Sequence, residues 1–427
     1  MTPLLIVGLF VLLIFLGVPI AFVIGIISLT GIATIPFIPN LTVFMKMFNG
    51  LNSFVLLAIP LFILAANIMN HGKITEMLVK FCIALVGNIR GGLAHANILV
   101  SMIFAGVSGS SQADTAGVGK MLIPAMIETG YDKENAVGVT AASSTIGVII
   151  PPSIPMVVYS GLTNASVAAL FLGGMIPGIL VGLAMMLIVY LMGHRRNFPK
   201  YEKAARSDVW KLFKVSFPAL LTPVIIVGGI TTGWYTPTEA AAFASVYAMI
   251  ISLFYYKTMK LKDLPEIIKE TLKLSSLSLF ALATASALGE LLGYYKASEH
   301  VAGFFAAHIG NPRIFMLIVI AFFIFVGTFM DAIPAMILFI PVILPSALRL
   351  GITSVHLGVV VVMTLAVGLV TPPYGLCLLI AGSIANLSIE RALKGVLPYI
   401  LALMLILLTV AMFPNVAFFV PKLLGVM

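Results

Sequence analysis

Apolar runs long enough to cross a bilayer recur along almost the whole chain, from Leu4 to Leu424. A helix of about 20 apolar residues spans the hydrocarbon core, whereas the strands of a barrel would give short alternating segments. No polar stretch between these runs is long enough to form a soluble domain. The pattern therefore predicts an all-α polytopic membrane protein.

Composition and charge agree with this class and indicate an orientation. The 427 residues are 61% hydrophobic and 9% charged, whereas soluble domains contain about 25% charged residues. Most of the net charge of +9 lies in two loops, and one of them, His194–Lys214, carries seven Lys or Arg against two acids. This excess is typical of a cytoplasmic loop beside the lipid bilayer, and we do not read it as a sign of nucleic-acid binding.

The pattern also repeats within the chain, at a shift of 221 residues. Glycines and prolines dominate the matches, which include Gly106 with Gly327, Pro124 with Pro345, Gly147 with Gly368, Pro151–Pro152 with Pro372–Pro373, and Gly174 with Gly395. What repeats is therefore backbone geometry. We expect two repeats, residues 1–214 and 215–427, and the basic loop between them makes the repeats inverted in the membrane, a common plan of secondary transporters.

Each repeat contains two short apolar segments around a small polar tip. Residues of about 91–127 surround the tip GVSGSSQADT, and residues of about 312–348 surround GTFMDA. An arm of about 16 residues extends roughly 24 Å, which is short for a full crossing. We expect two re-entrant hairpins, the first on the cytoplasmic side and the second on the periplasmic side. Two plain short transmembrane helices per hairpin are the alternative.

After each hairpin, prolines interrupt an apolar run. The first run covers about 133–163 and contains GVIIPPSIP, and the second covers about 355–385 and contains GLVTPPYGL. Proline has no backbone N–H and clashes with the carbonyl four residues earlier, which costs a helix interior about 3 kcal/mol. Two broken helices are therefore predicted, one in each repeat.

Each break should leave backbone carbonyls without helical partners, at Gly147, Val148, Gly368 and Leu369. Unpaired carbonyls are costly at membrane depth, and broken-helix transporters present such groups to cations. A simple kink satisfied by water or by Ser143 or Ser153 is the alternative. The occurrence of two breaks at equivalent positions, each beside a polar tip, favours an ion site.

The tips add hydroxyl and carboxyl groups. Ser108, Ser110 and Ser111 lie in the first tip, and the acids nearest to the two tips are Asp114 and Asp331. Acids inside a membrane usually mark ion or substrate pathways. Glu290 also lies in an apolar segment, where an interface position is the more ordinary interpretation.

Several other function classes are excluded by the sequence. The segment GVGK at Gly117 lacks the first glycine and the Ser or Thr of a phosphate-binding loop, and the six histidines show no metal-ligand spacing. No catalytic triad is legible, so we expect no enzyme and no cofactor apart from a coupling ion. A channel would need a continuous polar stripe, and a membrane scaffold would not need two broken helices. Energy for transport should therefore come from an ion gradient or from another subunit.

These motifs resemble a known family. GVSGSSQADTAGVGKMLIPAMIETGY, AASSTIGVIIPPSIPMVVYSG, GTFMDAIPAMILFIPVILP and GLVTPPYGL are similar to the large membrane subunit of tripartite ATP-independent periplasmic (TRAP) transporters. The resemblance covers nearly the whole chain. It implies a bacterial inner-membrane protein that works with a small four-helix membrane subunit and a soluble periplasmic substrate-binding protein. It also implies sodium-driven uptake of an organic acid by an elevator movement.

The resemblance implies two sodium sites, one at each hairpin and break, with Asp114 and Asp331 nearby. Their residues would be Ser108, Gly147, Ile150 and Pro152 in the first repeat, and Gly327, Met330, Gly368, Thr371 and Pro373 in the second. A substrate carboxylate needs hydroxyls or the N-termini of half-helices. The candidates for these contacts are Ser110, Ser111, Ser144, Ser153, Asp331 and Tyr374.

The overall resemblance favours the sialic-acid branch of the family, with C4-dicarboxylates next. No sugar-binding residue is identified in the sequence. A stand-alone Na⁺- or H⁺-coupled carboxylate symporter without a binding protein is the alternative.

Overall fold

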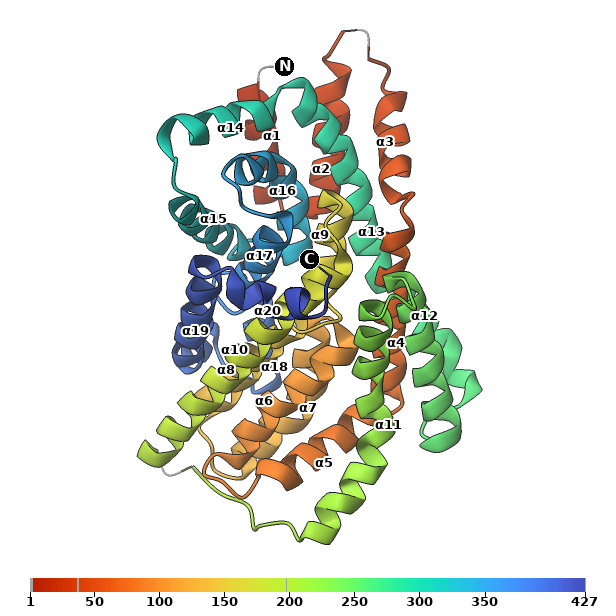
Figure 1. Cartoon of the computed structure of the whole chain (residues 1–427), viewed down its shortest axis with the longest axis vertical. Coiled ribbons are helices and arrows are strands. Elements are labelled where there is room, and N and C mark those ends of the chain that lie inside the picture. Colours follow the sequence, from red (N-terminus) through yellow and green to blue (C-terminus); the bar gives the residue numbers. More distant parts are fainter. Residues whose placement is uncertain (1–2, 37, 197, 427) are drawn as a thin grey trace.

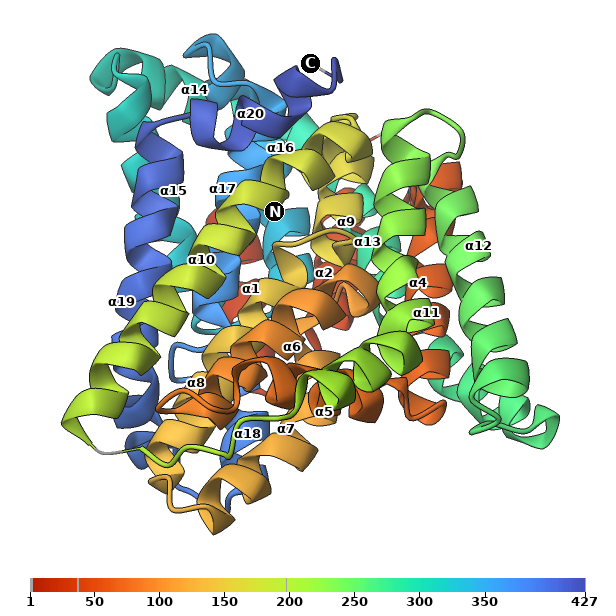
Figure 2. The same ribbon diagram turned by 60° about the horizontal axis from the view of Figure 1, so that its bottom comes forward.

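The computed structural model describes residues 3–36, 38–196 and 198–426, and all regular elements in these ranges are helices. Seven of the described helices are long and apolar enough to cross a membrane. The all-α polytopic membrane protein predicted from the sequence is thus confirmed. Figures 1 and 2 show that the helices form two bundles that lie side by side.

One bundle, which we call the outer bundle, is built from helices of both repeats. Helices α4 and α12 pack together, and α13 packs along α2, α3 and α4. The members are α1 (Pro3–Phe15), α2 (Ile20–Ala33), α3 (Leu41–Leu51), α4 (Ala58–His71), α11 (Arg206–Thr231), α12 (Pro237–Ile250) and α13 (Leu264–Tyr294). Short 3-10 or π turns adjoin them at Phe54–Leu57, Ile251–Tyr255 and Leu261–Asp263.

The other bundle, the inner bundle, contains both hairpins and both broken helices. Its first-repeat members are α6 (Gly92–Ser108), α7 (Ser111–Glu128), α8 (Lys133–Ser144), a 3-10 turn (Thr145–Val148), α9 (Ile154–Thr163) and α10 (Val167–Arg195). Its second-repeat members are α15 (Pro312–Gly327), α16 (Ala332–Arg349), α17 (Ser354–Gly368), α18 (Leu376–Ile384), α19 (Ile389–Met412) and α20 (Asn415–Leu423). The pair α6 and α7 and the pair α15 and α16 extend from opposite ends of the molecule toward its middle (Figure 1).

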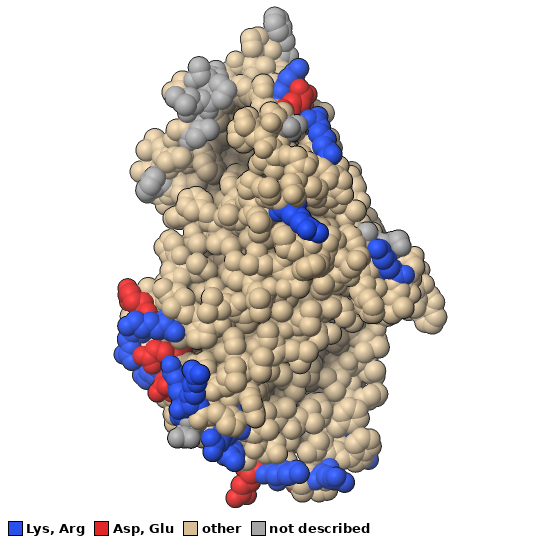
Figure 3. Space-filling model, turned by 60° about the vertical axis from the view of Figure 1, so that its left-hand side comes forward, with Lys and Arg blue, Asp and Glu red and all other residues tan. Residues whose placement is uncertain are grey.

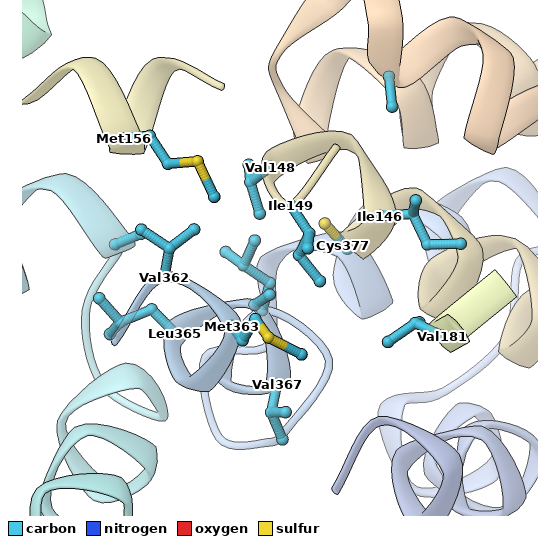
Figure 4. Packing of buried hydrophobic residues seen from close by; sticks show 14 of the residues in the cluster. Ile146, Val148, Ile149, Met156, Val181, Val362, Met363, Leu365, Val367 and Cys377 are labelled. Atoms are coloured by element: carbon cyan, nitrogen blue, oxygen red, sulfur yellow. The ribbon is translucent and has the colours of Figure 1, made fainter. Parts of the chain in front are cut away.

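The two repeats are interlocked inside the inner bundle. The second half of each broken helix packs against the hairpin of the other repeat, α9 against α16 and α18 against α7. Apolar side chains of the first break, including Ile146 and Ile149, share one buried cluster with Val362 and Leu365 of α17 (Figure 4). The two breaks are therefore held together by a common apolar core.

Glycines allow the closest crossings in this core. A Cβ atom at Gly395 of α19 would overlap the carbonyl oxygen of Glu134 on α8. At the equivalent position in the first repeat, a Cβ atom at Gly174 of α10 would overlap the carbonyl oxygen of Ile149. Gly174 and Gly395, which are equivalent in the two repeats, are thus both needed for the close contact of two backbone segments.

Two short helices connect the bundles. Helix α5 (Ile74–Val86) packs on α6 of the inner bundle and α11 of the outer bundle, and α14 (Ala297–His308) packs on α16 and α13. The segment His194–Lys214, expected to be a loop, is partly helical, since α11 begins at Arg206. Charged side chains gather mainly towards the end where α10 ends and α11 begins (Figure 3).

Candidate functional site

The tips of the two hairpins meet in the middle of the inner bundle. Gln112, in the first turn of α7, donates a hydrogen bond from Nε2 to Oδ2 of Asp331 over 3.0 Å. The other carboxylate oxygen of Asp331 accepts from the backbone N–H of Ala332 and so caps α16. Asp331 therefore connects the second tip to the first.

The first break is closed by one serine. Ser153 donates from its hydroxyl to the carbonyl of Val148 over 2.6 Å, and it accepts from the backbone N–H of Met156 at the start of α9. Ile154 donates from its backbone N–H to the carbonyl of Gly109 in the hairpin tip. The break is thereby tied to the tip of its own hairpin. The Val148 carbonyl has no helical partner, but it is not free: the alternative considered from the sequence, a bond from the hydroxyl of Ser153, is the one found.

The second break is closed by backbone groups. The carbonyl of Gly368 accepts from the N–H of Thr371 over 3.1 Å, and the carbonyl of Leu369 accepts from the N–H of Cys377 over 3.0 Å. The prediction that these two carbonyls lack partners was therefore wrong, because the chain turns back on itself after α17. Tyr374 donates from its N–H to the carbonyl of Thr328, which ties this break to the second tip.

Other carbonyls at the breaks remain unpaired. Within the described ranges, no hydrogen bond ends at the carbonyl oxygen of Gly147, Ile150 or Thr371. All three belong to the expected ion-binding residues. Both Pro–Pro bonds that follow these positions, at Pro151–Pro152 and Pro372–Pro373, are cis.

The two repeated glycines of the breaks lie against their own hairpins. A Cβ atom at Gly147 would lie 3.4 Å from the backbone nitrogen of Ser111, in ordinary contact. A Cβ atom at Gly368 would lie 2.8 Å from Cα of Gly327, which is too close. The expected residues Gly147 and Ser111, and likewise Gly368 and Gly327, are thus brought together. Ser108 lies buried at the first tip, Met330 belongs to the second, and Pro373 directly precedes Tyr374, whose N–H bonds to the second tip.

A small cavity of about 110 Å³ opens beside the meeting tips. Residues of both tips line it, including Ser108, Ser110, Ser111 and Asp331. Its opposite wall belongs to the outer bundle and comes from α4 and α13. The cavity therefore lies between the two bundles.

Three polar residues of this cavity were missed from the sequence. They are Gln112 of the first tip, Asn67 of α4 and Ser278 of α13. Asn67 also donates to the hydroxyl of Thr271 on α13. The available signal was one polar side chain within an apolar run, but no pattern in the sequence indicates that α4 and α13 face the tips.

Three other candidate residues lie away from this cavity. Ser144 donates to the carbonyl of Thr140 within α8, and the partly exposed Tyr374 does not line the cavity. Asp114 is fully buried on α7, and within the described residues neither of its carboxylate oxygens has a hydrogen-bond partner. Glu290 forms an ion pair with Lys46 over 2.7 Å in the outer bundle, which agrees with an interface position.

Comparison with known proteins identifies the family. The family model "Tripartite ATP-independent periplasmic transporter, DctM component" matches residues 7–416. The sialic acid TRAP transporter large permease protein SiaM of Vibrio cholerae serotype O1 is 37% identical over 378 residues, which cover 88% of each chain. The C4-dicarboxylate TRAP transporter large permease protein DctM of Pseudomonas aeruginosa is 35% identical over 380 residues, 89% of each chain.

A solved structure shares the fold. The YdaH transporter of Alcanivorax borkumensis superposes with a TM-score of 0.61 over 87% of this chain and 86% of that chain, at 14% sequence identity. The seven apolar helices and the family match make the chain a multi-pass inner-membrane protein, a transporter permease and not an enzyme. The resemblance seen in its motifs is confirmed: the chain belongs to the DctM family, the large permease component of TRAP transporters.

Proposed function

We propose that this large permease imports an organic acid, coupled to Na⁺, with sialic acid favoured and a C4-dicarboxylate next. The observation that carries this proposal is the charge of the tip cavity. Asp331 lines the cavity, and no Lys or Arg is among the described residues that do so. A carboxylate bound there would face a carboxylate without a cation, which is unfavourable away from water. Bound Na⁺ ions supply the missing positive charge.

The unpaired carbonyls at the breaks are suited to hold these ions. Na⁺ is a hard cation that takes oxygen ligands, and broken helices present carbonyl oxygens to it. The first site would use Ser108, Gly147, Ile150 and Pro152. The second would use Gly327, Met330, Gly368, Thr371 and Pro373. Because the carbonyls of Gly368 and Leu369 are already paired, we expect the Thr371 carbonyl to be the principal ligand of the second site.

The substrate would bind where the tips and the outer bundle meet. Ser110 and Ser111 offer a hydroxyl and backbone N–H groups at the start of α7, where the helix dipole favours an anion. Asp331 accepts hydrogen bonds and would bind hydroxyl groups of a sugar acid rather than its carboxylate. Ser144, Ser153 and Tyr374 are further candidates that would need a rearrangement, since none of them lines the cavity now.

The two bundles support an elevator movement. Both hairpins and both breaks belong to the inner bundle, so the whole binding region can move as one body. The connecting helices α5 and α14 would accommodate this movement. In this scheme residues 1–214 and 215–427 are inverted repeats, with the first hairpin on the cytoplasmic side and the second on the periplasmic side.

The partners follow from the family. We propose that the chain works with a small four-helix membrane subunit and a soluble periplasmic substrate-binding protein, because the relatives are named as large permeases of TRAP transporters. Relatives named for sialic acid and for C4-dicarboxylates are 37% and 35% identical to this chain. The substrate must therefore be decided by measurement.

Uptake into proteoliposomes tests this proposal. The chain is reconstituted with its small subunit, and labelled N-acetylneuraminate or succinate is presented with the cognate binding protein under an inward Na⁺ gradient. We expect uptake of one acid that stops when Na⁺ is replaced by choline and when the binding protein is omitted. Equal uptake without the binding protein would establish the stand-alone symporter instead. Equal uptake in choline would show that transport is not coupled to Na⁺.

A further inference from the structure

A second cavity, separate from the tip cavity, lies between the two bundles near the second hairpin. Its volume is about 470 Å³. Helices α1, α2 and α13 form its outer-bundle wall, and α14, α15 and α16 form the opposite wall. The side chains that line it are all apolar, and they include Ile6, Phe10, Leu288, Val301, Phe322 and Phe339.

This lining excludes polar occupants. A buried water needs two to four polar partners, and apolar cavities stay dry. A carboxylate or sugar would lose its hydrogen bonds there without compensation. Helix α13 is long and apolar enough to span the membrane, so the cavity lies beside hydrocarbon. A hydrocarbon chain is the occupant whose chemistry matches this lining.

The edge of the cavity offers charges that fit a phospholipid headgroup. Lys296 directly precedes Ala297, which lines the cavity, and Glu299 lies in the same first turn of α14. Both charged side chains are exposed, and among the described residues neither forms an ion pair. A zwitterionic headgroup carries a phosphate and an amine, which complement a lysine and a glutamate.

We propose that a zwitterionic membrane phospholipid inserts one acyl chain into this cavity, with its headgroup at the start of α14. The chain fills the gap between α1, α2 and α13 on one side and the second hairpin on the other. The lipid thus forms part of the contact between the two bundles. This site is separate from the tip cavity and does not depend on the identity of the transported acid.

Quenching of tryptophan fluorescence by brominated lipid tests the proposal. The native Trp210 and Trp234 are replaced by Phe, and a single Trp is introduced at Phe322 in the cavity. The permease with its small subunit is reconstituted in dibrominated phosphatidylcholine and in the unbrominated lipid. Matched controls carry the Trp at Phe171, which is 1% exposed in the inner bundle, or at Phe325, which is 65% exposed on the same helix as Phe322.

We expect strong quenching at Phe322→Trp and Phe325→Trp and little at Phe171→Trp. Adding Val301→Phe, which puts a larger side chain into the cavity beside Phe322, should reduce the quenching at Phe322→Trp by at least twofold and leave that at Phe325→Trp unchanged. Charge reversal by Lys296→Glu should also weaken quenching at Phe322→Trp. Monodispersity on size-exclusion chromatography shows that each variant folds.

Four results would overturn the proposal. Quenching at Phe322→Trp as weak as at Phe171→Trp would show that no acyl chain enters. Quenching that is insensitive to Val301→Phe would place the bromines in the surrounding lipid. Quenching that is strong in the chain alone but lost on adding the small subunit would identify that subunit as the occupant. If Lys296→Glu leaves the quenching unchanged, the occupant is a hydrocarbon chain whose headgroup does not contact Lys296, and the proposed phospholipid contact is wrong.

Discussion

The first break and the second break follow the same backbone plan, but different groups close them. In the first, the hydroxyl of Ser153 satisfies the carbonyl of Val148. In the second, backbone N–H groups satisfy the carbonyls of Gly368 and Leu369. The first tip is capped by the hydroxyl of Ser110, and the second by the carboxylate of Asp331 at the equivalent position.

This difference shows what a duplicated backbone preserves and what it leaves free. Glycine and proline positions are kept because they set where the chain can break and how closely it can approach. The groups that close each break can then diverge, since a hydroxyl and a backbone N–H donate equally well to a carbonyl. Among the described residues that line the tip cavity, the only carboxylate is Asp331 of the second tip. We therefore expect the two repeats to respond differently to equivalent mutations.

Mutation of the two equivalent cap residues, Ser110 and Asp331, should give the largest difference in uptake. Asp331→Ala removes the cap of α16, the partner of Gln112 and the only carboxylate among the described residues of the tip cavity. We expect uptake to fall by more than about 100-fold, because a hydrogen bond to a charged group and a helix cap are lost together, about 3 kcal/mol or more. Ser110→Ala loses one cap with a 3.4 Å hydrogen bond and should cost about 10-fold or less. Initial rates in proteoliposomes measure both.

Asp331→Asn is the matched control for this pair. It keeps an oxygen that can cap α16 and removes only the charge. Uptake close to that of Asp331→Ala would assign the effect to the charge, whereas uptake close to the parent would assign it to the cap. Equal losses in Asp331→Ala and Ser110→Ala would contradict the difference drawn between the two tips.

Substitution of the two equivalent glycines at the breaks, Gly147 and Gly368, should give the second largest difference in uptake. Gly368→Ala forces a methyl group against the backbone of Gly327, and such overpacking costs about 1–3 kcal/mol, or 5- to 150-fold in uptake if the cost falls on the transporting state. Gly147→Ala meets Ser111 at ordinary contact distance and should change uptake by less than about threefold. Replacement of Gly147 by a bulky residue should abolish uptake, since the space ends at Ser110 and Ser111.

A thermal unfolding midpoint recorded for each glycine variant separates folding from transport. We expect Gly368→Ala to lower the midpoint and Gly147→Ala to leave it nearly unchanged. A larger effect of Gly147→Ala than of Gly368→Ala, in uptake and in the midpoint, would mean that the first hairpin and not the second is the tighter contact.

Much of this architecture could be predicted because prolines and glycines act locally. A proline removes a donor wherever it lies, so Pro152 and Pro373 reveal two breaks without any knowledge of the fold. The polar tips were equally visible as short interruptions of apolar runs. The prediction went wrong where a backbone partner came from a few residues further along the chain, as with Cys377 at Leu369. At Val148 the partner is Ser153, which the sequence had offered only as the alternative.

The wall of the cavity could not be predicted, because it depends on which helices of the outer bundle face the tips. Asn67 and Ser278 are separated from the tips by many residues and carry no repeated pattern. Gln112 bonds to Asp331 across the boundary between the repeats, a contact that comparison of one repeat with the other does not reveal. Long-range pairing of this kind is set by packing of the whole bundle.

Removing the hydroxyls of Ser153 and Thr371, one at each break, should give the smallest difference between the repeats. We expect this difference in stability. Ser153→Ala removes the donor to the buried Val148 carbonyl and the cap of α9, so we expect a loss of about 1–3 kcal/mol and a lower unfolding midpoint. Thr371→Val removes a hydroxyl that bonds only to the Val367 carbonyl one turn back, and it should cost less than about 1 kcal/mol. Thr371→Val should also leave Na⁺ dependence intact if the Thr371 carbonyl is the ligand. A raised Na⁺ requirement in this variant would instead assign the ligand to the hydroxyl, and the second break would then be closed by side chains like the first.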